Sequence, residues 1–202
     1  MNQFFANLPL AAVISDTRGK IFCTHSGIGS NSLKIEDIEA LKRPINISFD
    51  QQSAEQQRVV DLLWNDPTDS EDERGIVPNQ TRDPSNPNSC VKKFGPDIVD
   101  KFLKINNMNM IVRSHQNTAK GEDRFWNGQL MTVSSCTDYC GTTGNAAGFM
   151  VVQKRMLISY KIIKPLQNSK QHWRDVVVPD SQDAPSVVRR PPTPVRSTVA
   201  GR

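Results

Sequence analysis

The stretch that decides the fold is residues 108–140, MNMIVRSHQNTAKGEDRFWNGQLMTVSSCTDYC. It opens with the apolar run 108–112, which is rich in β-forming residues and is followed at once by Arg113, Ser114 and His115. Polar residues at the end of a strand are a common place for loops that carry ligand-binding groups. The run therefore predicts a strand whose carboxyl end presents a candidate site.

A β-hairpin is predicted directly after this strand. Residues 124–126 and 129–133 flank the dipeptide Asn127-Gly128. Such a dipeptide favours a two-residue type I′ turn, because both central residues of that turn need positive φ.

Four segments of this region carry a resemblance to a known family: RSHQ at 113–116, the run 130–135, DYCG at 138–141 and GNA at 144–146. In this order they resemble the R-G/A-H-Q, T-V-F-S-A-P-N-Y-C-G and D-N-A block of the PPP-type serine/threonine protein phosphatases, and the type 1 branch in particular. Upstream segments match the family in the same order, at 8–13, 20–27, 43–44, 62–67 and 94–95. Several ordered matches over residues 5–155 make a chance resemblance improbable.

The resemblance implies an α+β fold, namely the C-terminal part of a metallophosphoesterase-type β-sandwich flanked by helices, in residues 1–163. Local patterns predict further strands at 8–15, 20–24, 130–135, 148–153 and 156–163. They predict helices that begin near Ser32, near residue 54 and at Pro96. Residues 66–88 are rich in Asp, Pro, Asn and Ser and are expected to form an extended surface loop.

The excess positive charge belongs to the C-terminal segment. Residues 1–163 carry 18 Lys and Arg against 18 Asp and Glu, whereas residues 164–202 carry 7 against 3, which accounts for the net charge of +4. A core with balanced charge gives no electrostatic basis for binding nucleic acid.

Residues 164–202 are rich in proline with few large apolar residues, and we expect a disordered basic tail. Thr193, in RPPTPVR, resembles the site that cyclin-dependent kinases modify in type 1 phosphatases.

The sequence also indicates a compartment. No apolar run approaches the length needed to cross a membrane, and the first residues lack the basic region of a signal peptide. The four cysteines are spaced irregularly, which favours free thiols over a disulfide framework or a zinc ribbon. We expect a protein of the cytoplasm, the nucleus or both.

The resemblance assigns His25 and His115 to one ion of a pair of divalent metals, either Mn, Fe or Zn. Neutral imidazole is a good ligand for these ions, and such a pair activates water for attack on phosphorus. The family's other metal-ligand and proton-donor motifs, G-D-x-H-G, G-D-x-x-D-R-G and G-N-H-E, do not occur in residues 1–202. We therefore expect an incomplete metal site. Ser26 also stands where the family has glycine, and its β-carbon is expected to disturb the local backbone.

Three further residues match positions around the substrate phosphate of the family. Arg82 resembles the phosphate-gripping arginine, whose planar fork suits a phosphate group, although Arg74 is a rival match. Tyr139 matches the tyrosine beside the phosphate, and Asp66 matches the aspartate of the W-S-D-P motif. The alternative for Asp66 is a simple turn residue before Pro67.

Three interpretations of the function remain open. The chain belongs to an active phosphoprotein phosphatase whose N-terminal half lies outside this sequence, or it is a non-catalytic pseudophosphatase that binds phosphoproteins and regulatory subunits, or it is a non-functional relic. In the first two cases its partners are phosphoproteins and phosphatase regulatory subunits. Hydrolysis by residues 1–202 alone is not expected.

Overall fold

The computed structural model describes residues 2–45, 47, 49 and 53–165. The predicted disordered tail and Thr193 lie outside the described residues. No helix among the described residues is both long enough and apolar enough to span a lipid bilayer.

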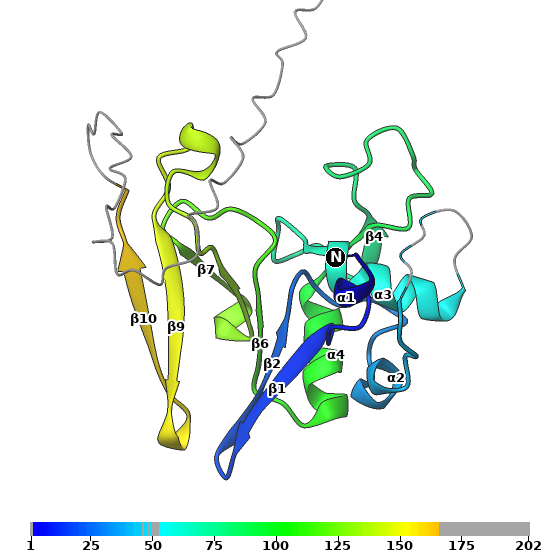
Figure 1. Cartoon of the computed structure of the whole chain (residues 1–202), viewed down its shortest axis with the longest axis horizontal. Coiled ribbons are helices and arrows are strands. Elements are labelled where there is room, and N and C mark those ends of the chain that lie inside the picture. Colours follow the sequence, from blue (N-terminus) through cyan, green and yellow to red (C-terminus); the bar gives the residue numbers. More distant parts are fainter. Residues whose placement is uncertain (1, 46, 48, 50–52, 166–202) are drawn as a thin grey trace, which may run out of the picture. The chain divides into compact units, whose positions relative to one another are not determined.

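The main sheet has five strands in the order β1-β2-β6-β8-β7 (Figure 1). They are β1 (Ala11–Asp16), β2 (Gly19–Thr24), β6 (Met110–Arg113), β7 (Glu122–Phe125) and β8 (Leu130–Val133). Strands β2, β6 and β8 run parallel, and Cys23 of β2 lies opposite Val112 of β6. Because parallel strands end at the same edge of a sheet, the residues that follow β2 and β6 meet there.

The central strands β2, β6 and β8 are covered on both faces, because successive side chains of a strand point to opposite sides of the sheet. Phe22, Ile111 and Leu130 share one apolar core with side chains of helix α4 (Pro96–Asn106). Ile21, Met110 and Met131 face the other way, towards the antiparallel pair β9 (Ala147–Gln153) and β10 (Leu157–Ile163). Figure 1 shows this pair on one side of β2 and β6 and α4 on the other. The predicted sandwich flanked by helices is confirmed.

The helices begin for identifiable reasons. α3 (Ala54–Trp64) starts with a capping box, in which the Ser53 hydroxyl accepts from Gln56 N and the Gln56 side chain accepts from Ser53 N. α4 starts at Pro96, as predicted, and ends at Asn107 in a left-handed conformation. α2 (Ile35–Glu39) is shorter than predicted, and Lys34 rather than Ser32 precedes it. The short α1 (Asn2–Phe5) lies before the first strand.

The predicted surface loop at 66–88 is present over most of its length, but two short strands interrupt it. This region contains β3 (Asp66–Pro67) and β4 (Ile76–Pro78), which join β5 (Lys92–Phe94) in a three-stranded sheet. Asp66, Thr68 and Asn79 are buried. Polar composition indicated exposure, and 69–74 and most of 80–88 are exposed, whereas Asn79 Nδ2 and Asp66 Oδ2 bond to each other in the interior.

The predicted hairpin forms, but its two-residue turn does not. Phe125 pairs with Leu130, so four residues connect β7 and β8. The connection contains the 3-10 turn η1 (Trp126–Gly128), whose three residues have φ of 50°, 55° and 83°. Trp126 is drawn into the core, where its ring lies 6.4 Å from that of Phe94. Two further 3-10 turns are η2 (Tyr139–Gly141) and η3 (Lys154–Met156).

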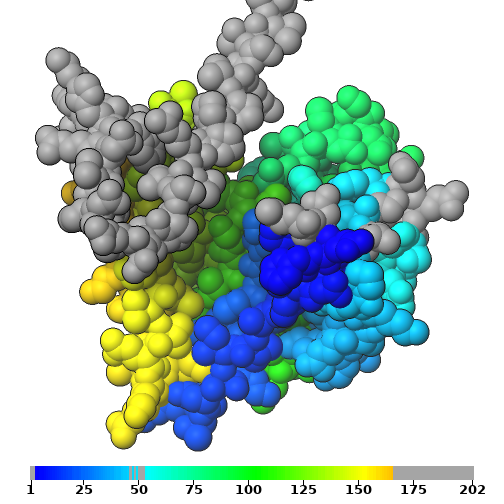
Figure 2. Space-filling model, in the orientation of Figure 1, coloured from blue at the N-terminus to red at the C-terminus, as the bar shows by residue number. Residues whose placement is uncertain are grey.

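The main sheet ends in an apolar edge strand. β1 pairs with β2 alone among the described strands, and Val13 and Ile14 are 42% and 40% exposed. Figure 2 shows the N-terminal segment and the β1–β2 hairpin, in blue, as part of the surface between β9 and the helical region. A shallow apolar hollow of about 590 Å³ adjoins this edge, bordered by Phe5, Leu10 and Ile47 among others.

Candidate functional site

Two imidazoles meet where β2 and β6 end. His25 follows β2 and His115 follows β6, and His25 Nε2 lies 3.0 Å from His115 Nδ1. The two segments are tied together, because Ser114 N donates to the His25 carbonyl over 3.0 Å. His115 has a φ of 65°, a left-handed conformation that is uncommon for a residue with a side chain. Such strained residues are found preferentially at functional sites.

Both imidazoles are held in the neutral form. Burial, followed by the charges of Arg113 and Arg82, lowers the pKa of His25. Burial and the charge of Arg82 lower the pKa of His115 to about 4. At neutral pH each ring therefore keeps a nitrogen lone pair. His115 Nε2 is buried and finds no hydrogen-bond partner among the described residues.

These two rings fit two ligands of a single metal ion. His25 Nε2 and His115 Nδ1 lie within hydrogen-bond distance of each other, 3.0 Å, so both could enter the coordination shell of one ion at the usual metal–nitrogen distance of about 2.1 Å. Within the part of the chain that the structure describes, no group of three or more His, Cys, Asp or Glu side chains is placed to hold a metal. The described residues therefore account for two ligands.

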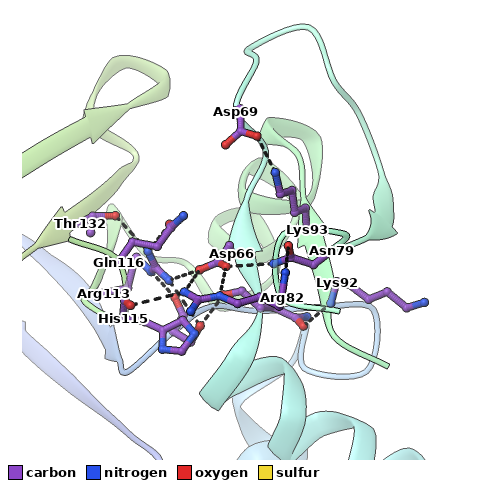
Figure 3. A network of polar contacts seen from close by, with 12 residues as sticks. Asp66, Asp69, Asn79, Arg82, Lys92, Lys93, Arg113, His115, Gln116 and Thr132 are labelled. Carbon is purple, nitrogen blue, oxygen red and sulfur yellow. Dashed lines mark hydrogen bonds and ion pairs between the residues drawn. The ribbon is translucent and has the colours of Figure 1, made fainter. Parts of the chain in front are cut away.

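Asp66 joins the two arginines of the site (Figure 3). Its Oδ1 accepts from Arg113 Nη2 over 2.8 Å, and its Oδ2 accepts from Arg82 Nε over 2.8 Å and from Asn79 Nδ2 over 2.9 Å. Burial alone would raise the pKa of Asp66, but the hydrogen bonds and charges of Arg82 and Arg113 hold it below its ordinary value. Asp66 is thus an ionised carboxylate in the interior that orients both guanidinium groups.

Arg113 is a fully buried cation with each of its five N–H donors used. Its partners besides Asp66 are Gln116 Oε1 at 2.6 Å, Thr132 Oγ1 at 3.4 Å and two oxygens of Ser26. Burial lowers the pKa of Arg113 to about 10, so the group remains charged at neutral pH. The buried charge therefore fixes the end of β6, two residues before His115.

Arg82 and Tyr139 border a polar hollow of about 660 Å³ beside the histidines. Arg82 is anchored along one edge by Asp66, and its Nη2 also lies 3.5 Å from the His115 carbonyl oxygen. Tyr139, in η2, is half exposed, and its backbone N–H donates to Asn145 Oδ1 over 2.8 Å. The hollow is lined by His25, Thr81, Arg82, Ser114, His115, Gln116, Asn117, Ser134, Ser135, Cys136 and Tyr139.

The structure thus brings four of the predicted residues to one hollow: His25, Arg82, His115 and Tyr139. Asp66 lies behind Arg82 and does not line the hollow, and the rival Arg74 is exposed on a separate loop. The roles of these residues remain predictions.

Sequence reasoning missed the interior partners that hold the site, Arg113, Asn79 and Gln116. The hint available for Arg113 was an arginine inside an otherwise apolar strand, where a charge needs a buried partner. All four cysteines carry free thiols.

Comparisons with known proteins agree with this geometry. The calcineurin-like phosphoesterase family profile matches residues 1–118. Serine/threonine-protein phosphatase BSL2 of Arabidopsis thaliana is 36% identical over 199 residues, which are 97% of this chain and 18% of that protein. A solved structure, a serine/threonine phosphatase from Saccharomyces cerevisiae with similarity to human phosphatase PP5, matches 83% of this chain and 50% of its own, with 26% identity and a TM-score of 0.65.

The chain therefore spans half or less of the length of these two relatives. The family profile nevertheless matches more than half of the chain, and the fold matches a solved member. The chain belongs to the calcineurin-like phosphoesterase family.

Proposed function

We propose that this chain is part of a serine/threonine phosphoprotein phosphatase of the type 1-like branch, with residues 1–163 forming the C-terminal portion of its catalytic domain. The observation that carries the proposal is the convergence of His25, His115 and Arg82 on one hollow. Its ligand would be a phosphoserine or phosphothreonine side chain of a protein.

Arg82 is suited to hold the phosphate. Asp66 accepts from its Nε and, over 3.4 Å, from its Nη2, so the plane of the guanidinium is fixed before a ligand arrives. A fixed planar fork binds phosphate oxygens with less loss of side-chain entropy than a free arginine does. Tyr139 borders the same hollow and would also contact the phosphate.

His25 and His115 would hold one divalent ion, Mn, Fe or Zn, through His25 Nε2 and His115 Nδ1. When bound, a divalent metal pair supplies activation of water and neutralisation of the phosphate charge. In this chain the buried Arg113 binds the Ser26 carbonyl and Gln116, the neighbours of His25 and His115 in the sequence, and the lowered pKa values keep both imidazoles neutral and able to bind.

We further propose that residues 1–202 do not turn over substrate unaided, because the two imidazoles are too few ligands for a metal pair. The alternative is a non-catalytic protein that binds phosphoproteins through the Arg82 hollow. That alternative draws support from the Asp66–Arg82 pair, which forms from the described residues alone. Phosphatase regulatory subunits as partners, kinase modification at Thr193, and a location in the cytoplasm or nucleus are proposed with it.

Binding of a phosphoserine peptide to residues 1–202, measured by fluorescence anisotropy, tests the site. Arg82→Ala should weaken binding roughly tenfold or more, since a charge-assisted hydrogen bond contributes about 1.5–3 kcal/mol. Arg74→Ala removes an arginine of a neighbouring exposed loop and should leave the affinity unchanged. Equal loss in both variants, or no loss in Arg82→Ala, would exclude Arg82 as the phosphate-binding residue.

A further inference from the structure

Ser26 was expected to disturb the backbone beside His25, and the structure gives it a different place. It is fully buried, and it is not among the residues with positive φ. Each of its polar groups has a partner. Its N–H donates to the Leu62 carbonyl over 3.0 Å, and its hydroxyl donates to the Asn65 carbonyl over 2.5 Å.

The remaining two bonds of Ser26 go to the buried guanidinium. The Ser26 carbonyl accepts from Arg113 Nε, and its hydroxyl oxygen accepts from Arg113 Nη2 over 3.4 Å. The hydroxyl is therefore the one group of Ser26 that contacts both the end of α3 and Arg113.

The carbonyls at the end of α3 have no partner within the helix, as at every helix terminus. The segment that carries His25 supplies partners for them, since Thr24 Oγ1 also donates to the Leu62 carbonyl over 3.2 Å. Asn65 returns the contact, because its side-chain amide donates to the Ile28 carbonyl over 3.1 Å. The position of the His25 segment and the position of the end of α3 are thus fixed together.

Each partner of the Ser26 hydroxyl leads to another residue of the site. Asn65 directly precedes Asp66, which orients Arg82. Arg113 lies two residues before His115 on the same segment. The hydroxyl of Ser26, the residue after His25, therefore contacts the backbone directly before Asp66 and the side chain of Arg113.

We infer that Ser26 is a positioning residue of this site, whose hydroxyl holds the imidazole of His25 at its observed distance from that of His115 by bridging Asn65 and Arg113. The inference rests on the proposed function in treating the two imidazoles as ligands of one metal ion. The contact between the two rings can be measured without a metal.

Ser32 offers a matched control, because it is also a fully buried serine. Its hydroxyl accepts from Gly29 N over 2.6 Å and lies 3.4 Å from Asp61 Oδ2, so its bonds stay away from Arg113 and both histidines. Ser26→Ala and Ser32→Ala each remove one buried hydroxyl. Ser26→Cys restores a weak donor and acceptor at the same place.

The first measurement uses the metal-free chain of residues 1–202. It contains three histidines, so the ring protons of His25 and His115 can be assigned by His→Ala variants. The two ring centroids are 4.9 Å apart, and a nuclear Overhauser contact between the rings is expected in the parent and in Ser32→Ala. The contact should be lost in Ser26→Ala and recovered in part in Ser26→Cys.

The second measurement titrates the same proteins with Ni²⁺, an ion that imidazole binds well, and subtracts the binding that remains in His115→Ala. Ser26→Ala should weaken this His115-dependent binding roughly 10- to 100-fold, the usual effect of removing a group that orients a ligand, while Ser32→Ala should not. Retention of both the ring contact and the Ni²⁺ affinity in Ser26→Ala would overturn the inference, as would equal loss in Ser32→Ala. Absence of His115-dependent binding in the parent would instead contradict the metal-holding part of the proposed function, and the ring contact would then decide on Ser26 alone.

Discussion

Asp66 Oδ1 lies 2.8 Å from Arg113 Nη2, and the two side chains are 2% and 0% exposed. The same carboxylate accepts from Arg82, whose side chain is 29% exposed, so one negative charge serves a buried guanidinium group and one that borders the hollow. The two histidines lie beside this arrangement, and their pKa values are lowered first by burial and then by the positive charges of Arg82 and Arg113.

Asp66→Asn should destabilise the chain by about 3–5 kcal/mol, because it leaves the buried Arg113 without a counter-charge. Urea unfolding at neutral pH measures the change. Asp69→Asn is the control, since the Asp69 side chain is 79% exposed and its ion pair with Lys93 should contribute no more than about 1 kcal/mol. Similar losses in the two variants would mean that the Asp66 charge is not needed inside the protein.

Asp61 is a second buried aspartate, and the opposite response is expected from it. It accepts from Gln57 Nε2 over 2.9 Å and from Asn65 Nδ2 over 3.0 Å, and none of its hydrogen-bond partners is a cation. Burial raises its pKa above the ordinary value of 3.8, although the hydrogen bonds of Gln57 and Asn65 oppose this.

Because the folded pKa of Asp61 is raised, the native state binds a proton that the unfolded state releases in the window between 3.8 and the raised value. The free energy of unfolding that this group contributes is present below pH 3.8 and is lost as the pH rises through the window. Asp61→Asn should remove that loss, and stability at neutral pH should stay equal or increase. Unfolding of both proteins across the acid range tests this, and a variant that loses stability mainly at neutral pH would contradict it.

Features of the fold that are set within one segment of the chain could be predicted from the sequence. Features that are set by contacts between distant segments could not. The strands of the main sheet, the helix near residue 54 and the helix that begins at Pro96 follow from local patterns, and the structure contains them. Within 66–88 the buried Asp66 was not predicted, because its polar partner is distant in sequence: Arg113 lies 47 residues away. The predicted two-residue turn at Asn127-Gly128 does not form, because burial of Trp126 outweighs the local preference of this dipeptide.

The same distinction between local patterns and contacts of distant segments applies to the candidate site. The family resemblance assigned His25 and His115 to one ion, and in the structure His25 Nε2 lies 3.0 Å from His115 Nδ1. The bonds that hold them, through Ser26, Asn65 and Arg113, link three elements whose contacts no local pattern encodes. Ser26 shows this most clearly, because its β-carbon suggested disturbance while its hydroxyl forms two bonds in the fold.

The apolar edge strand β1 should make the isolated chain prone to association. Unpaired edge strands that lack charged residues are sites of edge-to-edge pairing, and Ala11 to Ser15 carry no charge. We expect residues 1–202 to form oligomers or aggregates in size-exclusion chromatography with light scattering. Val13→Lys places a charge on this exposed position and should increase the monomer fraction, whereas Val77→Lys, in the edge strand β4 of the three-stranded sheet, should not. A parent chain that is monomeric with a sharp melting transition would contradict the prediction.

Purified residues 1–202 should not hydrolyse phosphoserine peptides or p-nitrophenyl phosphate, even with excess Mn²⁺. Activation of water in this family requires two metals, and among the described residues His25 and His115 supply ligands for one of them. The sequence also contains no G-N-H-E motif, whose histidine donates the proton to the leaving oxygen in the family. Loss of general acid catalysis alone would lower the rate on the order of 10²- to 10⁴-fold.

The assay needs His115→Ala as a matched preparation, because contaminating host phosphatase would persist in it. Turnover that His115→Ala and a chelator both abolish would show that other residues of this chain complete the metal site.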